Sequence, residues 1–233
     1  MDARFPQGFF ENRQVLVFDW DGTLFDSMAL KTQSFAEVLS EDLAKRCGPA
    51  APSRERVAAL YRALSGRPRA EIFDGVAATA GVTLGAADKA ALSDRLFVRN
   101  RVLLPSSSLF PDAERLLERL QGTAYRLFMS SSVPQAELEH FFTAKLPEAW
   151  RQRFDGVFGS APGFGKGPGH IEAIRRQTGV ALANILVFGD DEADHALSTQ
   201  AGVDCVLIDR EGRPGSGHPY TIPSFDSVGP LLS

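Results

Sequence analysis

Cysteine is scarce in this chain, with Cys47 and Cys205 as the two cysteines among 233 residues. They lie far apart and form no CxxC pair, which fits two reduced thiols better than a disulfide framework. A basic excess is also absent, because the net charge is -4, and this argues against a nucleic-acid-binding face. No apolar run has the length of a signal peptide or of a membrane span. We therefore expect a cytoplasmic protein that binds neither nucleic acid nor a membrane.

Apolar residues make up 44% of the chain, which is enough for one large domain or a core with an insertion. Apolar runs predict strands at 15–18, 125–129, 184–188 and 203–208. Helical periodicity predicts a helix that begins at Pro111 and helices over 168–178 and 192–201. Alternating strands and helices predict a parallel sheet with right-handed crossovers. Ligands bind at the carboxyl ends of such strands, where this chain has polar residues.

Residues 27–104 break the alternation, because this stretch contains helical patterns alone. We predict four helices here, inserted after the first strand. The expected domains are a core of residues 1–26 and 105–233 and an inserted domain of residues 27–104. The Gly- and Pro-rich segment 210–219 is expected to be a surface loop, and its sequence indicates no role.

The first predicted strand, Val15-Leu16-Val17-Phe18, runs directly into Asp19-Trp20-Asp21-Gly22-Thr23. Side chains alternate along a strand, so Asp19 and Asp21 project to the same side. Two neighbouring carboxylates disfavour each other's ionised form, and a hard cation such as Mg²⁺ is the natural compensation. The alternative is an ordinary Asp-Gly turn after a strand. A carboxylate before the turn, at an otherwise apolar strand, favours the metal site.

Four separated signals then resemble the haloacid dehalogenase superfamily of phosphohydrolases over nearly the whole chain. They are, in order, Asp19-Trp20-Asp21-Gly22-Thr23, Ser131, Lys166 and Gly189-Asp190-Asp191-Glu192-Ala193-Asp194. The resemblance implies an α/β fold, with a Rossmann-like parallel core and a four-helix cap domain, as in relatives of phosphoglycolate phosphatase and β-phosphoglucomutase. The chain departs from the family at Pro111-Asp112, where proline-glycine is usual, and at Gly167, where proline usually follows the lysine.

The resemblance assigns Asp19 as the nucleophile that forms an aspartyl-phosphate, a form of covalent catalysis. Asp21 would protonate the leaving alcohol and later take a proton from water. It also implies Mg²⁺ as cofactor, held by the Asp19 carboxylate, the Asp21 carbonyl and Asp190, with Asp194 nearby or bridging through water. Asp191 and Glu192 are equally explained as acidic residues in the first turn of a helix.

The resemblance implies that Ser131, Lys166 and Thr23 bind phosphate. Among the serines, Ser132 is the second choice and Ser130 the third. The serines are alternatively explained as a helix-capping turn, and Lys166 as a solvated loop lysine. In the cap, Arg67 or Arg69 would clamp a substrate carboxylate or second phosphate; the alternative is that both arginines are solvated.

The predicted function is a magnesium-dependent phosphatase that hydrolyses a small phosphorylated metabolite, similar to phosphoglycolate or a sugar phosphate. The alternatives are a phosphomutase with the same carboxylates and a non-catalytic phosphate-binding module. A dehalogenase is disfavoured because Asp21 is present. The sequence predicts neither the substrate nor the oligomeric state, and it is compatible with a monomer.

Overall fold

The computed structural model describes residues 5–212 and 218–232, and the chain divides into two compact units. Unit 1 comprises Met1–Phe25 and Leu109–Ser233, and unit 2 comprises Asp26–Ser108. The expected surface loop at 210–219 lies partly outside the described residues. No helix in the described ranges has the length and apolar character that crossing a bilayer requires.

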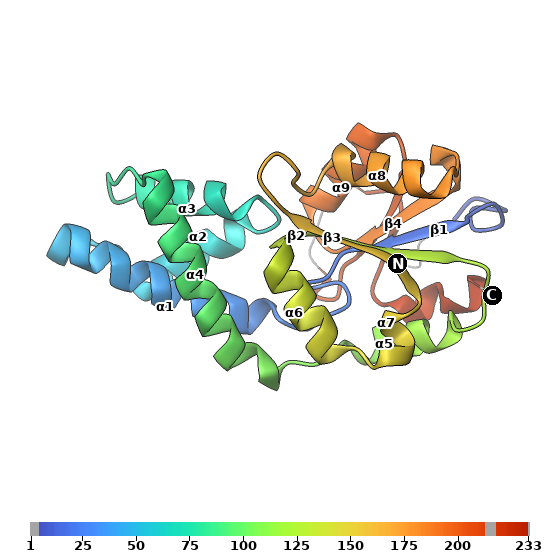
Figure 1. Cartoon of the computed structure of the whole chain (residues 1–233), viewed down its shortest axis with the longest axis horizontal. Coiled ribbons are helices and arrows are strands. Elements are labelled where there is room, and N and C mark those ends of the chain that lie inside the picture. Colours follow the sequence, from blue (N-terminus) through green and yellow to red (C-terminus); the bar gives the residue numbers. More distant parts are fainter. Residues whose placement is uncertain (1–4, 213–217, 233) are drawn as a thin grey trace. The chain divides into compact units, whose positions relative to one another are not determined.

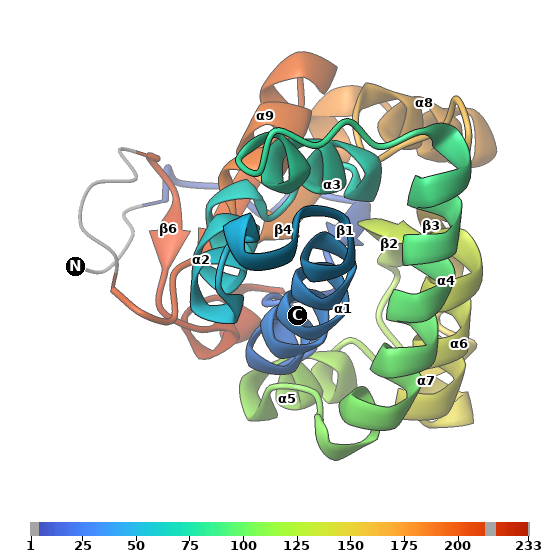
Figure 2. The same ribbon diagram turned by 90° about the vertical axis from the view of Figure 1, so that its left-hand side faces the viewer.

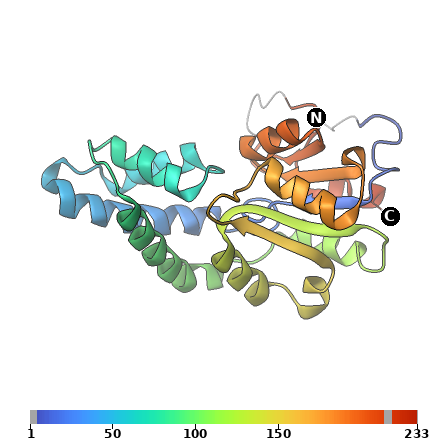
Figure 3. The ribbon, with the colours of Figure 1, turned by 45° about the horizontal axis from the view of Figure 1, so that its top comes forward.

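Unit 1 is built on a parallel sheet in the order β3-β2-β1-β4-β5-β6. The strands are β1 (Val15–Phe18), β2 (Arg126–Pro134), β3 (Phe154–Ser160), β4 (Ile185–Gly189), β5 (Asp204–Ile208) and β6 (Thr221–Ile222). Figure 3 shows β2 and β3 running side by side. Phe18 pairs with Met129 on one neighbouring strand and with Phe188 on the other. The residues that follow these positions therefore meet at one edge of the sheet.

Helices cover both faces of this sheet, with α8 and α9 on one face and α5, α6 and α7 on the other (Figure 1). Their bounds are α5 (Pro111–Arg119), α6 (Gln135–Lys145), α7 (Glu148–Arg151), α8 (Pro168–Thr178) and α9 (Glu192–Ala201). Short 3₁₀ turns are η3 (Leu182–Asn184), η4 (Phe225–Ser227) and η5 (Gly229–Leu231). On the first face, Val15, Val17 and Val187 pack against Ile171, Ile174 and Leu197. The α/β fold with a parallel sheet, predicted from the sequence, is confirmed.

Three strands differ from the sequence prediction. β6 was not predicted, because two residues are too few to show a strand pattern. β3 was not predicted, because its sequence Phe-Asp-Gly-Val-Phe-Gly-Ser has two glycines and is half-buried at the sheet edge. The second strand was predicted to end at Met129, whereas β2 continues through Ser130, Ser131 and Ser132 to Pro134. The serines therefore belong to an extended segment beside β3.

Unit 2 contains the helices that are labelled α1 to α4 in Figure 2. They are α1 (Met28–Cys47), α2 (Arg54–Leu64), α3 (Arg69–Ala78) and α4 (Ala86–Leu103), with 3₁₀ turns η1 (Gly48–Ala50) and η2 (Leu104–Ser106). Ser53 caps α2 by accepting a hydrogen bond from the Arg56 N–H. The unit has its own apolar core, which includes Phe35, Leu39 and Phe73. A separate core of this kind is what an inserted domain needs for its own stability.

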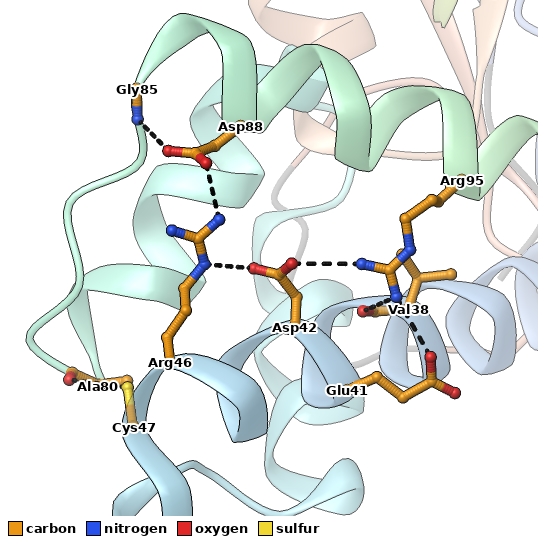
Figure 4. Close-up of polar contacts among 9 residues, drawn as sticks. All are labelled: Val38, Glu41, Asp42, Arg46, Cys47, Ala80, Gly85, Asp88 and Arg95. Atoms are coloured by element: carbon orange, nitrogen blue, oxygen red, sulfur yellow. Dashed lines mark hydrogen bonds and ion pairs between the residues drawn. The ribbon is translucent and has the colours of Figure 1, made fainter.

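Charged side chains connect α1 to α4 on the surface of unit 2 (Figure 4). Asp42 accepts hydrogen bonds from Arg46 at 2.7 Å and from Arg95 at 3.2 Å. Arg46 also reaches Asp88 at 2.7 Å, and Arg95 reaches Glu41 at 3.2 Å. Because such networks are partly exposed, they add modestly to stability and chiefly fix how the two helices align.

Candidate active site

The acidic residues at the carboxyl ends of the strands come from three elements of unit 1. Asp19 follows β1, Asp190 follows β4, and Asp194 lies in the first turn of α9. One carboxylate oxygen of each lies within 4.8 Å of the others. Asp19 is 6% exposed and Asp194 is 1% exposed. The structure therefore brings together three of the residues that the sequence predicted as metal ligands.

Two glycines make this close approach possible. Gly22 has a φ of 79°, and a Cβ at this position would lie 2.3 Å from Asp190 Oδ2. A Cβ on Gly189 would lie 2.0 Å from the Asp194 Cγ. Any larger residue would displace one of these two carboxylates. The glycines in both motifs thus leave space for the acidic side chains.

The turn after Asp19 is tightly hydrogen-bonded. The Gly22 N–H donates to the Phe25 carbonyl at 2.9 Å, and the Phe25 N–H donates to the Trp20 carbonyl at 2.8 Å. The Trp20 ring stacks on Phe25 with centroids 4.9 Å apart. Trp20 is therefore a packing residue. Asp21 is half-buried in this turn.

Lys166 reaches the acidic group from the loop between β3 and α8. Its Nζ lies 2.8 Å from Asp19 Oδ1 and 2.8 Å from Asp194 Oδ1, and its side chain is 5% exposed. Burial alone would lower the pKa of Lys166, but the charges of Asp19 and Asp194 outweigh burial and hold the pKa well above its usual value. Lys166 therefore carries a positive charge between two carboxylates.

The carboxyl pKa values are raised despite Lys166. Burial raises the pKa of Asp19 from 3.8 to about 6, while the Lys166 charge opposes the increase. Burial and repulsion from Asp19 raise the pKa of Asp190 well above its usual range. Burial also raises the pKa of Asp194, whose Oδ2 has no hydrogen-bond partner among the described residues. A further cation near these oxygens would relieve the repulsion.

Asp191 has a different task from its neighbours. It caps α9, since its Oδ1 accepts hydrogen bonds from the Ala193 N–H at 2.9 Å and the Asp194 N–H at 3.2 Å. Thr23, predicted to bind phosphate, is fully buried, and its hydroxyl donates to Asp190 Oδ1 at 3.2 Å. The structure thus places Thr23 as a partner of Asp190.

The three serines differ in their surroundings. Ser130 Oγ lies 2.9 Å from His170 Nδ1, so its hydroxyl is engaged in a buried contact. Ser131 is 1% exposed, and its Oγ accepts a hydrogen bond from the Val133 N–H at 3.3 Å. Ser132 is half-buried. Because Ser130 is committed to His170, Ser131 stays the first candidate for contact with a phosphate.

The two predicted cap arginines lie in unit 2. Arg67 is exposed between α2 and α3. Arg69 is half-buried and donates a hydrogen bond from NH1 to Ser93 Oγ at 3.1 Å. The role of both in substrate binding stays a prediction.

Sequence reasoning missed Asp112, His170 and Arg210, which all lie near this edge of unit 1. Arg210 comes two residues after the end of β5, and such strand ends are where ligand sites form. That position is the signal that could have marked it. His170 sits inside a helical pattern with nothing local to distinguish it. Asp112 stands where the family usually has glycine, but this departure by itself indicates no role.

The family model of haloacid dehalogenase-like hydrolases matches residues 14–202, a range that includes the strands β1 to β4 and the helix α9. The chain belongs to the haloacid dehalogenase-like hydrolases. No sequence among the curated proteins matches it.

Three solved structures illustrate how widely this hydrolase fold is shared. The first is a predicted phosphoglycolate phosphatase from Haemophilus somnus, 19% identical, with a TM-score of 0.72, covering 95% of this chain and 99% of that one. The second is CbbY from Rhodobacter sphaeroides in complex with xylulose-1,5-bisphosphate, 16% identical, with a TM-score of 0.71, covering 93% and 96%. The third is YfnB from Bacillus subtilis bound to magnesium, 16% identical, with a TM-score of 0.63, covering 95% and 99%. At these identities the likeness establishes the fold.

Proposed function

We propose that this hydrolase is a magnesium-dependent phosphatase that releases phosphate from a small phosphorylated metabolite through an aspartyl-phosphate on Asp19. The observation that carries the proposal is the buried Asp19 carboxylate within 4.8 Å of oxygens from Asp190 and Asp194. Lys166, bound to Asp19 and Asp194 at 2.8 Å each, adds a cation that can also attract a phosphate. The proposed nucleophile, the proposed magnesium ligands and a charge that could attract a phosphate are therefore neighbours, which supports the proposal.

The side chains fit Mg²⁺, which prefers oxygen ligands. Asp194 Oδ2 is buried without a hydrogen-bond partner among the described residues, and the pKa values of all three carboxyl groups are raised, with burial as the largest cause. We expect the Asp19 and Asp190 carboxylates and the Asp21 carbonyl to hold the ion, with Asp194 beside it. When bound, Mg²⁺ supplies positive charge that offsets the carboxylates and the phosphoryl oxygens.

In the first step, an Asp19 carboxylate oxygen attacks the phosphorus while the bond from phosphorus to the substrate's bridging oxygen breaks. The Asp21 carboxyl gives its proton to the departing alkoxide, which leaves as an alcohol. In the second step, Asp21 takes a proton from water, whose oxygen attacks the same phosphorus. The bond between Asp19 and phosphorus then breaks, which releases phosphate and restores the carboxylate.

Two further residues support the transferred group in this scheme. Lys166 neutralises the phosphoryl oxygens, and the Ser131 hydroxyl donates a hydrogen bond to one of them. We also propose that unit 2, the inserted domain, acts as a cap that excludes water during the first step. Arg67 and Arg69 of the cap would recognise an anionic part of the substrate.

The test is hydrolysis of p-nitrophenyl phosphate with Mg²⁺, with EDTA, and by two variants. We expect turnover with Mg²⁺, loss of turnover in EDTA, and loss of turnover in Asp19→Asn. Asp155→Asn is the matched control, because Asp155 is an exposed carboxylate of β3 that pairs with Arg126 at 3.0 Å. Turnover that persists in Asp19→Asn would remove Asp19 from the nucleophile role.

A panel of phosphorylated metabolites then identifies the substrate class. Release of free phosphate supports a phosphatase. An isomerised sugar phosphate without free phosphate would instead show the phosphomutase alternative, which uses the same carboxylates.

A further inference from the structure

Arg210, just after β5, makes a set of contacts that the proposed chemistry does not use. Its NH1 donates to both oxygens of Asp112, at 2.9 and 2.8 Å. Its NH2 donates to the Thr23 carbonyl at 3.0 Å, and its Nε donates to the Gly22 carbonyl at 3.4 Å. All of these residues belong to unit 1. One guanidinium thus joins the first turn of α5 to the turn that follows Asp21.

The Arg210 guanidinium is itself held in place. Its central carbon lies 3.8 Å from the centre of the Phe110 ring, which is a close cation–π contact. Asp112 also accepts a hydrogen bond from the Phe225 N–H at 2.7 Å. The side chains of Arg210 and Asp112 are 19% and 7% exposed. A shielded pair of this kind fixes geometry more strongly than an exposed pair.

The anchored turn lies directly against Asp190. The Thr23 hydroxyl donates to Asp190 Oδ1 at 3.2 Å, and Gly22 leaves no space for a Cβ beside Asp190 Oδ2. A shift of the Gly22 and Thr23 backbone would therefore move the Asp190 carboxylate or break its hydrogen bond. Because Asp21 directly precedes this turn, the same shift would move its backbone carbonyl.

The same contacts reach the point where the chain returns to unit 1. The Phe110 N–H donates to the Leu24 carbonyl at 2.9 Å, and Phe25 bridges Leu109. Arg210 therefore contacts the chain just before it leaves unit 1, through the Gly22 and Thr23 carbonyls. It also contacts the chain just after it re-enters unit 1, through the Phe110 ring. The turn is held between Arg210 on one side and Asp190 on the other.

We propose that Arg210, oriented by Asp112, is a positioning residue that holds the Gly22–Thr23 turn against Asp190 and thereby sets the affinity of the acidic site for Mg²⁺. This inference rests on the proposed function in taking Asp19, Asp190 and Asp194 as the magnesium site. It assigns Arg210 no contact with substrate.

The experiment measures Mg²⁺ binding by calorimetry in the absence of substrate, beside urea unfolding in EDTA, for four proteins. These are the wild type, Arg210→Lys, Asp112→Asn and the control Arg115→Met. Lysine keeps the charge but offers no planar fork that could bind Asp112 and two carbonyls together. Arg115 is on α5 like Asp112, but its ion pair with Asp226 is about half exposed.

We expect the dissociation constant for Mg²⁺ to rise at least about tenfold in Arg210→Lys and Asp112→Asn, the effect of one lost charge-assisted hydrogen bond. Arg115→Met should bind like the wild type. The concentration of Mg²⁺ that gives half-maximal turnover should rise in parallel, with a smaller change in kcat at saturating Mg²⁺. A merely structural contact would lower the unfolding midpoint in urea without this shift.

Folded variants of Arg210 and Asp112 that bind Mg²⁺ within about twofold of the wild type would overturn the proposal. Failure of both variants to fold would overturn it too, in favour of a structural contact. The wild-type result separates the two proposals. Mg²⁺ binding without hydrolysis of any phosphate ester would refute the proposed function and leave the role of Arg210 to be decided by the variants.

Discussion

Replacing Asp19 by asparagine should stabilise the metal-free protein although it removes the proposed nucleophile. Burial raises the pKa of Asp19 from 3.8 to about 6, so the ionised carboxylate at pH 7 is less favourable in the folded state than in the unfolded state. Each pKa unit corresponds to about 1.4 kcal/mol, which gives a destabilisation of about 3 kcal/mol. Asparagine carries no charge, and Lys166 keeps its ion pair with Asp194 at 2.8 Å. The variant should therefore gain up to about 3 kcal/mol.

The gain should depend on pH. Since the folded-state pKa of Asp19 lies above its unfolded value, the folded protein holds this proton more tightly. The resulting stability is present below pH 3.8 and is lost as the pH rises through about 6. The difference in unfolding free energy between variant and wild type should therefore be small near pH 4 and reach about 3 kcal/mol at pH 7.

Urea unfolding in EDTA at several pH values measures this difference. Asp155→Asn, at an exposed carboxylate, should change stability little at any pH. Added Mg²⁺ should stabilise the wild type, by about 2.7 kcal/mol at a hundredfold excess over the dissociation constant, and should stabilise Asp19→Asn less. An Asp19→Asn protein that is less stable than the wild type at pH 7 in EDTA would refute the reasoning.

Three further substitutions test separate parts of the site. Lys166→Met should lose about 3–5 kcal/mol of unfolding free energy, because it leaves two buried carboxylates without their lysine; urea unfolding showing wild-type stability would argue that the lysine is solvated. Gly22→Ala should lose about 1–3 kcal/mol from the strained φ and should weaken Mg²⁺ binding by displacing Asp190; unchanged calorimetric affinity would contradict the contact. His170 is buried, which lowers its pKa from 6.5 to about 4, so the unfolded state takes up its proton first and stability falls as the pH drops below 6.5. Between pH 7 and pH 5 the free energy of unfolding should therefore fall by about 2 kcal/mol less in His170→Asn than in the wild type. Equal falls in the two proteins would exclude His170 as the cause of the pH dependence.

The parts of the fold that could be predicted are those with strong local patterns. The run Val15–Phe18 is fully buried as β1, as its β-branched, continuously apolar sequence indicates. The helices over 168–178 and 192–201 are α8 and α9, and both end at a left-handed glycine. The edge strand β3 escaped prediction, because half-burial and two glycines weaken its periodicity.

The candidate site shows the same division between local and tertiary information. Asp19 and Asp190 could be grouped from the sequence because each follows a predicted strand, and Asp194 could be added because it lies four residues after Asp190 in the first turn of a predicted helix. The Ser130 contact with His170 could not, because it depends on how α8 lies over β2. The ion pair of Arg210 with Asp112 joins residues 98 positions apart, and no local pattern specifies such a partner.

Direct detection of the phosphorylated aspartate tests the central claim most directly. The wild type is mixed with p-nitrophenyl phosphate and Mg²⁺, quenched in acid during turnover and reduced with borohydride, which converts an aspartyl-phosphate to homoserine. Peptide mass spectrometry should then locate homoserine at Asp19 and at no other aspartate, and Asp19→Asn should show none. A phosphorylated residue elsewhere, such as Ser131, with Asp19 unmodified during turnover, would contradict the account.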